Sequence, residues 1–475
     1  MLFNSVLFLV FFLLVYSLYH FTSYKFRKPI LLISSMIFYS AWEIIGFGSK
    51  IPFFLLHFIS VILINYLFIL YFEKEVNEFK RKLALTIILF LNITNLCFFK
   101  YLYFFVEITG LVFGHPEWRP EFEKNFHIIL PIAISFYTFQ TIAFVVDKFK
   151  KEIPEHTTLT DFSIFIFFFP QQLAGPILRA RDFLPSLHKE PEMDENKIYD
   201  GLIYIGLGLM KKGILADSVA IIVNPVFQSP SDYSWLAISI SCILFYFQLW
   251  GDFSGYSDMA IGCAKLLGFD LPRNFNAPLA ALSFREMWER WHITLSSFLR
   301  DYIYIPLGGN KVSNFRASFN SIFTMTLAGL WHGANWNYLI WGLSIGIHLV
   351  VERLFLNRFS FWKETNSMLN RIVKLFLLNL TWFYYSTIFR VNSLSDFGVI
   401  TKKILTLSKG KMIPTNEILT LTLLFGILHH LEYKSNKLEF LKRKPLVYSF
   451  AIGLILLFFL GDLSNKQTQF IYFQF

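Results

Sequence analysis

IPFFLLHFISVILINYLFILYF, residues 51 to 72, is an apolar run of the length that crosses a lipid bilayer. A spanning α-helix needs roughly 20 consecutive apolar residues. Comparable runs lie at residues 1–19, 29–47, 83–99 and 128–146. Of the 475 residues, 55% are hydrophobic and only 16% are charged, and the mean hydropathy is +0.50. The sequence therefore predicts an all-α, polytopic membrane protein that has the lipid bilayer as its solvent.

Basic residues gather in every second connection between these runs. The clusters lie at residues 25–28, 74–82 and 148–151. Since cytoplasmic loops carry an excess of Lys and Arg, we expect these three clusters in the cytoplasm. The connection 114–127 mixes both signs of charge and is expected outside, as is the N-terminus. Because the positive charge follows the loops, the net charge of +10 does not indicate a nucleic-acid partner.

The two ends of the chain are also expected to span the membrane. Residues 1–19 have no basic residue ahead of the apolar part and no small residues at its end, so a retained span is expected rather than a cleaved signal peptide. Lys442, Arg443 and Lys444 precede the last apolar run, 447–460. This order predicts a C-terminus outside.

The segment FSIFIFFFPQQLAGPILRARDF, residues 162 to 183, is apolar over too few residues to cross and is broken at Pro170, Gly175 and Pro176. Basic connections lie on both sides of it, which favours a re-entrant segment. Its irregular backbone must then be buried in protein or line a wet cavity. A short buried helix followed by a loop is the alternative.

Asp252, Asp258 and Asp270 lie in a glycine-containing stretch, residues 248–278. Acidic groups at membrane depth are costly, so we expect them to face an internal cavity or the interface. Taken one at a time, a helix cap for Asp252 and surface positions for the other two are the simpler alternative.

Residues 283–310 carry apolar side chains at helical spacing. The apolar face comprises Phe284, Trp288, Trp291, Leu295 and Phe298, and the opposite face comprises Arg285, Glu289, His292 and Ser296. This pattern predicts an amphipathic helix at the membrane interface, with Arg285 paired to Glu289 four residues on. Many surface helices share this pattern, so His292 by itself is weak evidence for chemistry.

His332 lies between glycines and tryptophans in GLWHGANW, residues 329 to 336. An ionisable side chain in an apolar segment indicates a functional site. Desolvation keeps an imidazole neutral, and a neutral imidazole can accept a proton as a general base. The alternative is a structural histidine that only pairs two helices.

Several blocks of the sequence resemble one family. They are PQQLAGPILRARDF (170–183), FYFQLWGDFSGYSDMAIG (245–262), NFNAPLAALSFREMWERWHITLSSFLRDYIYIPLGGN (274–310), GLWHGANWNYLIWG (329–342) and FIYFQF (470–475). Together they resemble the membrane-bound O-acyltransferase family and, within it, the bacterial alginate O-acetylation branch. The resemblance implies a ring of about 11–13 transmembrane helices, with re-entrant and interfacial helices, around a central tunnel.

The resemblance also implies a reaction. His332 is implied as the catalytic histidine and His292 as the second. An acyl group, acetyl in the nearest branch, is implied to pass from a cytoplasmic thioester, such as acetyl-CoA or an acyl carrier, to a hydroxyl of an exported polysaccharide. No Gly-x-Ser-x-Gly elbow is present, and no cysteine is near a base in sequence, which favours direct transfer. We expect no metal and no bound cofactor.

Further site residues, partners and boundaries are expected on the same basis. The candidates for substrate binding are Trp331, Asn335, Arg290, Asp301 and Asn274. The expected partner is an accessory periplasmic or extracellular acyltransferase, and the expected location is the bacterial inner membrane. One domain is expected over residues 1–475, with N-terminal spans (1–125), a catalytic core (126–355) and C-terminal spans (356–475).

Two other classes of function fit parts of the sequence. A transporter or flippase could use His332 as a proton relay, although the chain has no two related halves of the kind that many transporters have. A non-catalytic scaffold for a secreted acyltransferase would tolerate substitution of His332.

Overall fold

The computed structural model describes residues 2–48, 50–153, 156–173, 175–190, 195–354, 358–359, 367–414, 416–433, 449, 451–456 and 458. In these residues the chain forms helices and connecting loops and no strand. The predicted all-α membrane fold is confirmed. The basic residues 442–444, part of the last apolar run and residues 470–475 lie outside the described residues.

Among the described residues, five helical stretches are long and apolar enough to cross a membrane. They are α2 (Tyr24–Phe47), α3 (Phe53–Lys74), α4 (Glu78–Leu96) continued through a π-helical turn (Cys97–Tyr101) into α5 (Leu102–Phe113), α13 (Trp235–Leu266) and α19 (Met368–Arg390). Two shorter apolar helices are α1 (Val6–Phe21) and α21 (Ile418–Tyr433). The opening run, residues 51–72, thus corresponds to α3.

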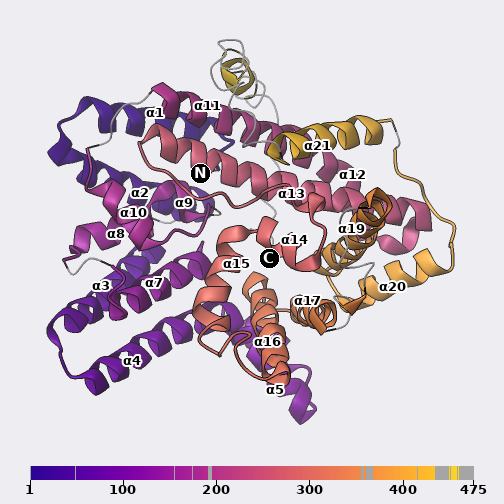
Figure 1. The fold of residues 1–475 in the computed structure, drawn as a ribbon, viewed down its shortest axis with the longest axis horizontal. Helices are drawn as coiled ribbons and strands as arrows, with labels where there is room; N and C mark the ends of the chain where they lie inside the picture. The colour runs from indigo at the N-terminus through magenta and orange to yellow at the C-terminus, as the bar shows by residue number, and fades with distance from the viewer. Residues whose placement is uncertain are drawn as a thin grey trace. The chain divides into compact units, whose positions relative to one another are not determined.

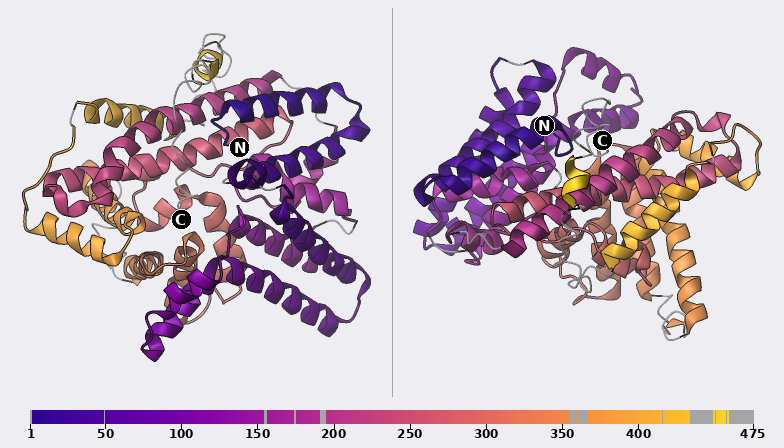
Figure 2. Two further views of the ribbon diagram at one scale, coloured as in Figure 1. Left: turned by 180° about the vertical axis from the view of Figure 1, so that it is seen from behind. Right: turned by 90° about the horizontal axis from the view of Figure 1, so that it is seen from above.

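The described residues divide into two compact units. The first comprises Met1–Ile205 and Met259–Pro272. Besides α1 to α5 it contains α6 (Trp118–Asn125), α7 (Ile134–Phe149), α8 (Leu159–Phe167), α9 (Phe169–Gln172), α10 (Ala180–Leu187) and most of α11 (Glu195–Leu209). Helix α7 packs against both α3 and α4 (Figure 1), and α1 packs along α2, in indigo at the start of the chain (Figure 2).

The segment 162–183 is divided into short helices. Helix α8 has 9 residues and α9 has 4, and the chain bends between them at Phe168. Every residue from 161 to 173 is buried. The segment is therefore too short to cross and is buried in protein, and its re-entrant path stays a prediction.

The second unit comprises Gly206–Asp258 and Arg273–Phe458. Its helices are a π-helical turn (Met210–Ala216), α12 (Asp217–Gln228), most of α13, α14 (Phe284–Arg290), α15 (Ile293–Leu299), a second π-helical turn (Arg300–Tyr304), α16 (Asn314–His332), α17 (Trp336–Leu354), α19, α20 (Leu394–Leu405) and α21, with 3₁₀ turns at Pro230–Asp232 and Pro278–Ala280. This unit contains every candidate site residue.

The prediction of one continuous amphipathic helix over residues 283–310 is wrong. The chain forms α14 and α15 and breaks between them at His292, whose backbone is left-handed with φ 44°. The apolar face is confirmed, because Phe284, Trp288, Trp291, Leu295 and Phe298 are all buried. The pair between Arg285 and Glu289 is also confirmed, at 3.0 Å.

Hydrogen bonds from a distant segment cause this break. The amide of Ile293 donates to the carbonyl of Asn274 at 2.9 Å, and the amide of Asn276 donates to the carbonyl of Arg290 at 2.9 Å. These bonds replace helical bonds across the break. A non-glycine residue in the left-handed region costs of the order of 1–3 kcal/mol. His292, placed on the polar face by the sequence, is instead fully buried.

Helices α16 and α17 form a close antiparallel hairpin (Figure 1). Three glycines allow the two backbones to touch: a Cβ on Gly329, Gly342 or Gly346 would lie 2.2, 2.3 or 2.7 Å from backbone atoms of the facing helix. Small residues at such contacts are typical of helix pairs in membranes. The hairpin places His332, the last residue of α16, at its turn.

The three acidic residues have different surroundings. Asp252 is buried in the middle of α13 and pairs with Lys212 at 2.6 Å. Asp258 pairs with Lys211 at 2.7 Å, and Asp270 pairs with Lys265 at 2.6 Å in a more exposed position. The helix-cap alternative for Asp252 and the surface alternative for Asp258 are therefore wrong, whereas Asp270 does lie at the surface.

Candidate active site

His332 lines a small cavity in the second unit. The lining residues are Leu249, Trp291, His332, Trp341, Trp382, Ser386 and Phe389. The cavity has about 10 Å³ of space for a water-sized sphere, which is room for roughly one water molecule. It is the place beside His332 where a small reacting group can be held.

Aromatic rings surround the His332 imidazole. The ring centroids of Trp331, Phe389 and Trp341 lie at 4.9, 5.0 and 5.3 Å from it, all close to edge-on. The side chain is 6% exposed. Because this environment is apolar, the neutral form of the imidazole is favoured. Three of the cavity residues come from α19, within the region 356–475 for which the sequence predicts only spans.

His292 is held by Asn274, which comes from the loop after α13. The imidazole Nδ1 lies 3.1 Å from Asn274 Oδ1. The same oxygen accepts hydrogen bonds from the Thr294 amide at 3.2 Å and the Thr294 hydroxyl at 2.9 Å. Two other donors mark this atom as the acceptor, so Nδ1 of His292 carries the proton and Nε2 carries the lone pair.

Within the described residues, Nε2 of His292 has no hydrogen-bond partner, so its lone pair accepts no hydrogen bond there. Burial lowers the pKa of His292 to about 3, so its ring is neutral at physiological pH. The His292 centroid lies 5.8 Å from that of Trp331, the residue next to His332. Trp331 thus lies against both histidines, and the imidazole of His292 is neutral.

The structure brings some predicted site residues together and separates others. Trp331 contacts both histidines, and Asn274 positions His292. Asn335 is half-buried in the turn between α16 and α17. Arg290 instead donates to Glu286 at 2.9 Å and to the carbonyl of Asn276 at 3.0 Å.

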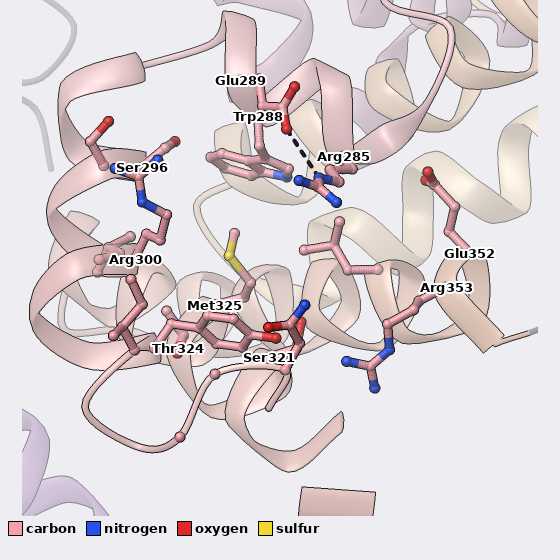
Figure 3. A pocket seen from close by; sticks show the side chains of 18 of the residues that line it. Arg285, Trp288, Glu289, Ser296, Arg300, Ser321, Thr324, Met325, Glu352 and Arg353 are labelled. Atoms are coloured by element: carbon pink, nitrogen blue, oxygen red, sulfur yellow. Dashed lines mark hydrogen bonds and ion pairs between the residues drawn. The ribbon is translucent and has the colours of Figure 1, made fainter. Parts of the chain in front are cut away.

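Asp301 lies near a much larger pocket, where it pairs with Arg300 at 2.7 Å. This pocket has a volume of about 1000 Å³ and is bounded by α14, α15, the second π-helical turn with the loop after it, the middle of α16 and the end of α17. Figure 3 shows the guanidinium groups of Arg285, Arg300 and Arg353 around it. Trp288 also lines it, and Trp288 packs against Trp341 at 6.0 Å. Tryptophans thus stand between the large pocket and the His332 cavity.

The charge in this large pocket is partly uncompensated. Its basic residues are Arg285, Arg300, Lys311 and Arg353, and its acidic residues are Glu289 and Glu352. Glu289 pairs with Arg285. Within the described part of the chain, Lys311 and Arg353 form no ion pair. The pocket therefore suits an anionic ligand with an apolar portion.

Sequence reasoning missed a buried ionic cluster in the same unit. Lys211 binds Asp258 at 2.7 Å and Glu432 at 3.0 Å. The two lysines at 211 and 212, which interrupt an apolar stretch, were the available signal for this cluster. Glu432 gave no comparable signal, because it lies close to the polar end of its helix.

Comparisons with known proteins identify the family of this chain. The model of the membrane-bound O-acyltransferase family matches residues 34–394. The peptidoglycan O-acetyltransferase of Helicobacter pylori is 30% identical, over 100% of this chain and 98% of that protein. The probable alginate O-acetylase AlgI of Pseudomonas aeruginosa is 38% identical over 74% of this chain and 66% of that protein. The teichoic acid D-alanyltransferase of Streptococcus thermophilus is 28% identical over 54% of this chain and 65% of that protein.

The helical membrane fold and these similarities define the class of protein: it is a membrane-embedded acyltransferase enzyme. The chain belongs to the membrane-bound O-acyltransferase family. In the described residues, no group of three or more His, Cys, Asp or Glu side chains is placed to hold a metal ion.

Proposed function

We propose that this enzyme transfers an acetyl group from a cytoplasmic thioester to a hydroxyl of an exported cell-envelope polysaccharide, with His332 as the general base. The observation that carries the proposal is the position of His332 on the wall of the small aromatic cavity. The similarity to a peptidoglycan O-acetyltransferase over the whole chain supports a polysaccharide acceptor and an acetyl group.

The cavity supports His332 rather than His292 as the base. His332 lines space that a substrate atom can enter, whereas His292 is 0% exposed. In the reaction, the acceptor hydroxyl oxygen attacks the thioester carbonyl carbon while His332 takes the hydroxyl proton. The C–S bond then breaks, and the leaving thiolate takes the proton from the imidazolium. The products are the ester and the free thiol. One positioned base contributes roughly 10²–10⁴-fold to such a step.

His292 assists from the other side of Trp331. Its unprotonated Nε2 is buried and is fixed in orientation by Asn274. A lone pair held in this way can accept a hydrogen bond from a substrate hydroxyl and orient it for attack. The indole N–H of Trp331 and the amide of Asn335 are further candidates to hold the substrate at the same turn.

The large pocket is proposed as the donor site. A thioester such as acetyl-CoA combines phosphates with an apolar arm, which matches the basic rim and the mainly apolar wall of this pocket. The small cavity beyond the tryptophans accepts only a small group, which supports acetyl over a long acyl chain.

Removal of a pocket charge is expected to weaken donor binding selectively. Lys311→Gln should raise the KM for acetyl-CoA by roughly 10-fold, the value of a charge-assisted hydrogen bond, and leave kcat almost unchanged. Steady-state kinetics on purified enzyme would measure this. Arg316→Gln is the matched control, since Arg316 is exposed and does not line the pocket. Equal KM values for Lys311→Gln and wild type would remove Lys311 from the donor site.

The proposed location is the bacterial inner membrane. By the charge of the connections, residues 25–28, 74–82 and 148–151 are in the cytoplasm and 114–127 lies outside. In intact cells, single cysteines at residues 76 and 149 should resist a membrane-impermeant maleimide, and one at residue 116 should react. Labelling of residue 76 or 149 from outside would overturn this orientation.

The proposed function also includes an accessory protein outside the membrane, because the catalytic ring is buried and polysaccharides are large. The test incubates the purified enzyme with a labelled acetyl thioester and a polysaccharide, with and without extracellular protein from the same cells. Ester formation supports the proposal. If the protein were a transporter, no ester would form, and if it were a scaffold, none would form without a second enzyme. Acylation of long polysaccharide at full rate by the purified enzyme alone would refute the need for an accessory protein.

A further inference from the structure

Glu432, near the end of α21, accepts four hydrogen bonds in the second unit. Its Oε1 accepts from Lys211 Nζ at 3.0 Å and from Ser254 Oγ at 3.0 Å. Its Oε2 accepts from the indole of Trp250 at 3.2 Å and from the backbone amide of Ala277 at 2.8 Å. The carboxylate is 10% exposed. Both oxygens are therefore saturated by donors from three other segments of the chain.

The bond to Ala277 connects Glu432 to the loop that holds His292. We call residues 274–280 the strap. Asn274, at one end of the strap, fixes His292 through its Oδ1. Ala277 has a left-handed backbone, with φ 45°. A non-glycine residue in this conformation needs support from its surroundings, and the Glu432 carboxylate supplies it at the Ala277 amide.

Other residues of α21 hold the same strap. His429 Nε2 accepts from the amide of Leu279 at 3.2 Å. The ring of Tyr433 lies 5.8 Å from the guanidinium of Arg290, which donates to the carbonyl of Asn276. One helical turn of α21 thus supports the strap at several points. This helix lies beyond residue 394, where the match to the family model ends.

We propose that Glu432 is a positioning residue that acts on the reaction through the strap and His292. The inference rests on the proposed function, in which His292 assists the transfer. Glu432 touches neither histidine. It fixes Ala277, the strap fixes Asn274, and Asn274 fixes the ring and the tautomer of His292.

The ionic surroundings make Glu432 testable without unfolding the protein. Lys211 has two carboxylate partners, Glu432 and Asp258. Removing one of these carboxylates leaves the lysine paired, so no buried cation is stranded. Glu432→Gln therefore keeps the size of the side chain and the charge pairing of Lys211. It replaces one acceptor oxygen with an NH₂ group, which cannot accept from Ala277 or Trp250.

Asp258→Asn is the matched control. Asp258 lies on α13 and pairs with the same lysine, and among the described residues it forms no hydrogen bond with the strap. If Glu432 served only to neutralise Lys211, the two variants would behave alike. If Glu432 acts through the strap, only Glu432→Gln should affect the reaction.

The experiment measures kcat and KM per folded molecule for the wild type and both variants, with acetyl-CoA as the donor. A displacement of a catalytic group by about 1 Å can cost roughly 100-fold in rate. We expect Glu432→Gln to lower kcat by roughly 10- to 100-fold with the donor KM unchanged, and Asp258→Asn to stay near wild type. Hydrogen exchange by mass spectrometry should show faster exchange of peptides covering residues 274–280 in Glu432→Gln alone.

Wild-type kcat in Glu432→Gln, or an equal loss of kcat in Asp258→Asn, would overturn the inference. Unchanged exchange in the strap of Glu432→Gln would also overturn it. Absence of acetyl transfer by the wild type would instead refute the proposed function, and the exchange measurement would still report whether Glu432 holds the strap. The two failures are therefore distinguishable.

Discussion

His332→Gln should fold and insert normally but lose acyl transfer by roughly 10²–10⁴-fold, the contribution of one positioned base. Glutamine keeps some of the size of the imidazole and can form hydrogen bonds, but it cannot accept a proton. His332→Ala should be equally inactive, because it removes the proton acceptor and strands no buried charge. Activity per folded molecule, with folded protein measured by size-exclusion chromatography, is the quantity to compare.

His348, a half-buried histidine, provides the control for this comparison. His348 on α17 stacks on Phe284 at 4.1 Å and does not line the His332 cavity. His348→Gln should therefore retain near-wild-type turnover per folded molecule. A His332→Gln enzyme with near-normal turnover would exclude the general-base role. If His332 only pairs two helices, His332→Gln should keep activity per folded molecule. His332→Ala should then mainly reduce the amount of folded protein.

Asn274→Leu should lower kcat nearly as much as His292→Ala. Asn274 Oδ1 accepts the hydrogen bonds of three donors, one of which is the imidazole of His292. Leucine has a similar size but no acceptor, so the Nδ1–H group is left buried and unpaired at a cost of about 1–3 kcal/mol. The ring then loses the bond that selects its tautomer. We expect a loss of roughly 10- to 100-fold in kcat, which is this cost expressed as a rate.

The kinetic pattern separates positioning from substrate binding, the role that the sequence suggested for Asn274. A positioning role lowers kcat and leaves the acceptor KM unchanged, whereas a direct substrate contact raises that KM. Ser257→Ala is the control, since Ser257 only accepts from the amide of Asn274 at 3.4 Å. Full turnover of Asn274→Leu would show that the orientation of His292 does not matter to the reaction.

Much of the architecture could be predicted because hydropathy is a local property. The apolar run 51–72 lies mainly in α3 (Phe53–Lys74), and the apolar positions of residues 283–310 are buried as their spacing predicts. His332 in GLWHGANW, residues 329 to 336, could be identified from the sequence alone, since an ionisable residue in an apolar segment is unusual in any membrane fold. Local chemistry sufficed for these predictions.

The arrangement around the histidines needed the tertiary structure. The spacing of residues 283–310 predicts one helix with His292 on its polar face, but bonds from Asn274 and Asn276 break that helix and bury the ring. From the sequence, Asp252 could be a helix cap and Asp258 a surface residue. The structure instead pairs Asp252 with Lys212 and Asp258 with Lys211. Lys211 and Glu432 are 221 residues apart in the chain.

The sequence by itself determined the solvent, the helical class and the histidines worth testing, because each depends on the character of a residue and its near neighbours. Only the tertiary structure decided which ring nitrogen of His292 carries the proton and which carboxylate supports the strap. Those features depend on donors and acceptors brought within about 3 Å by packing, and no periodicity in the sequence encodes a distance between remote segments.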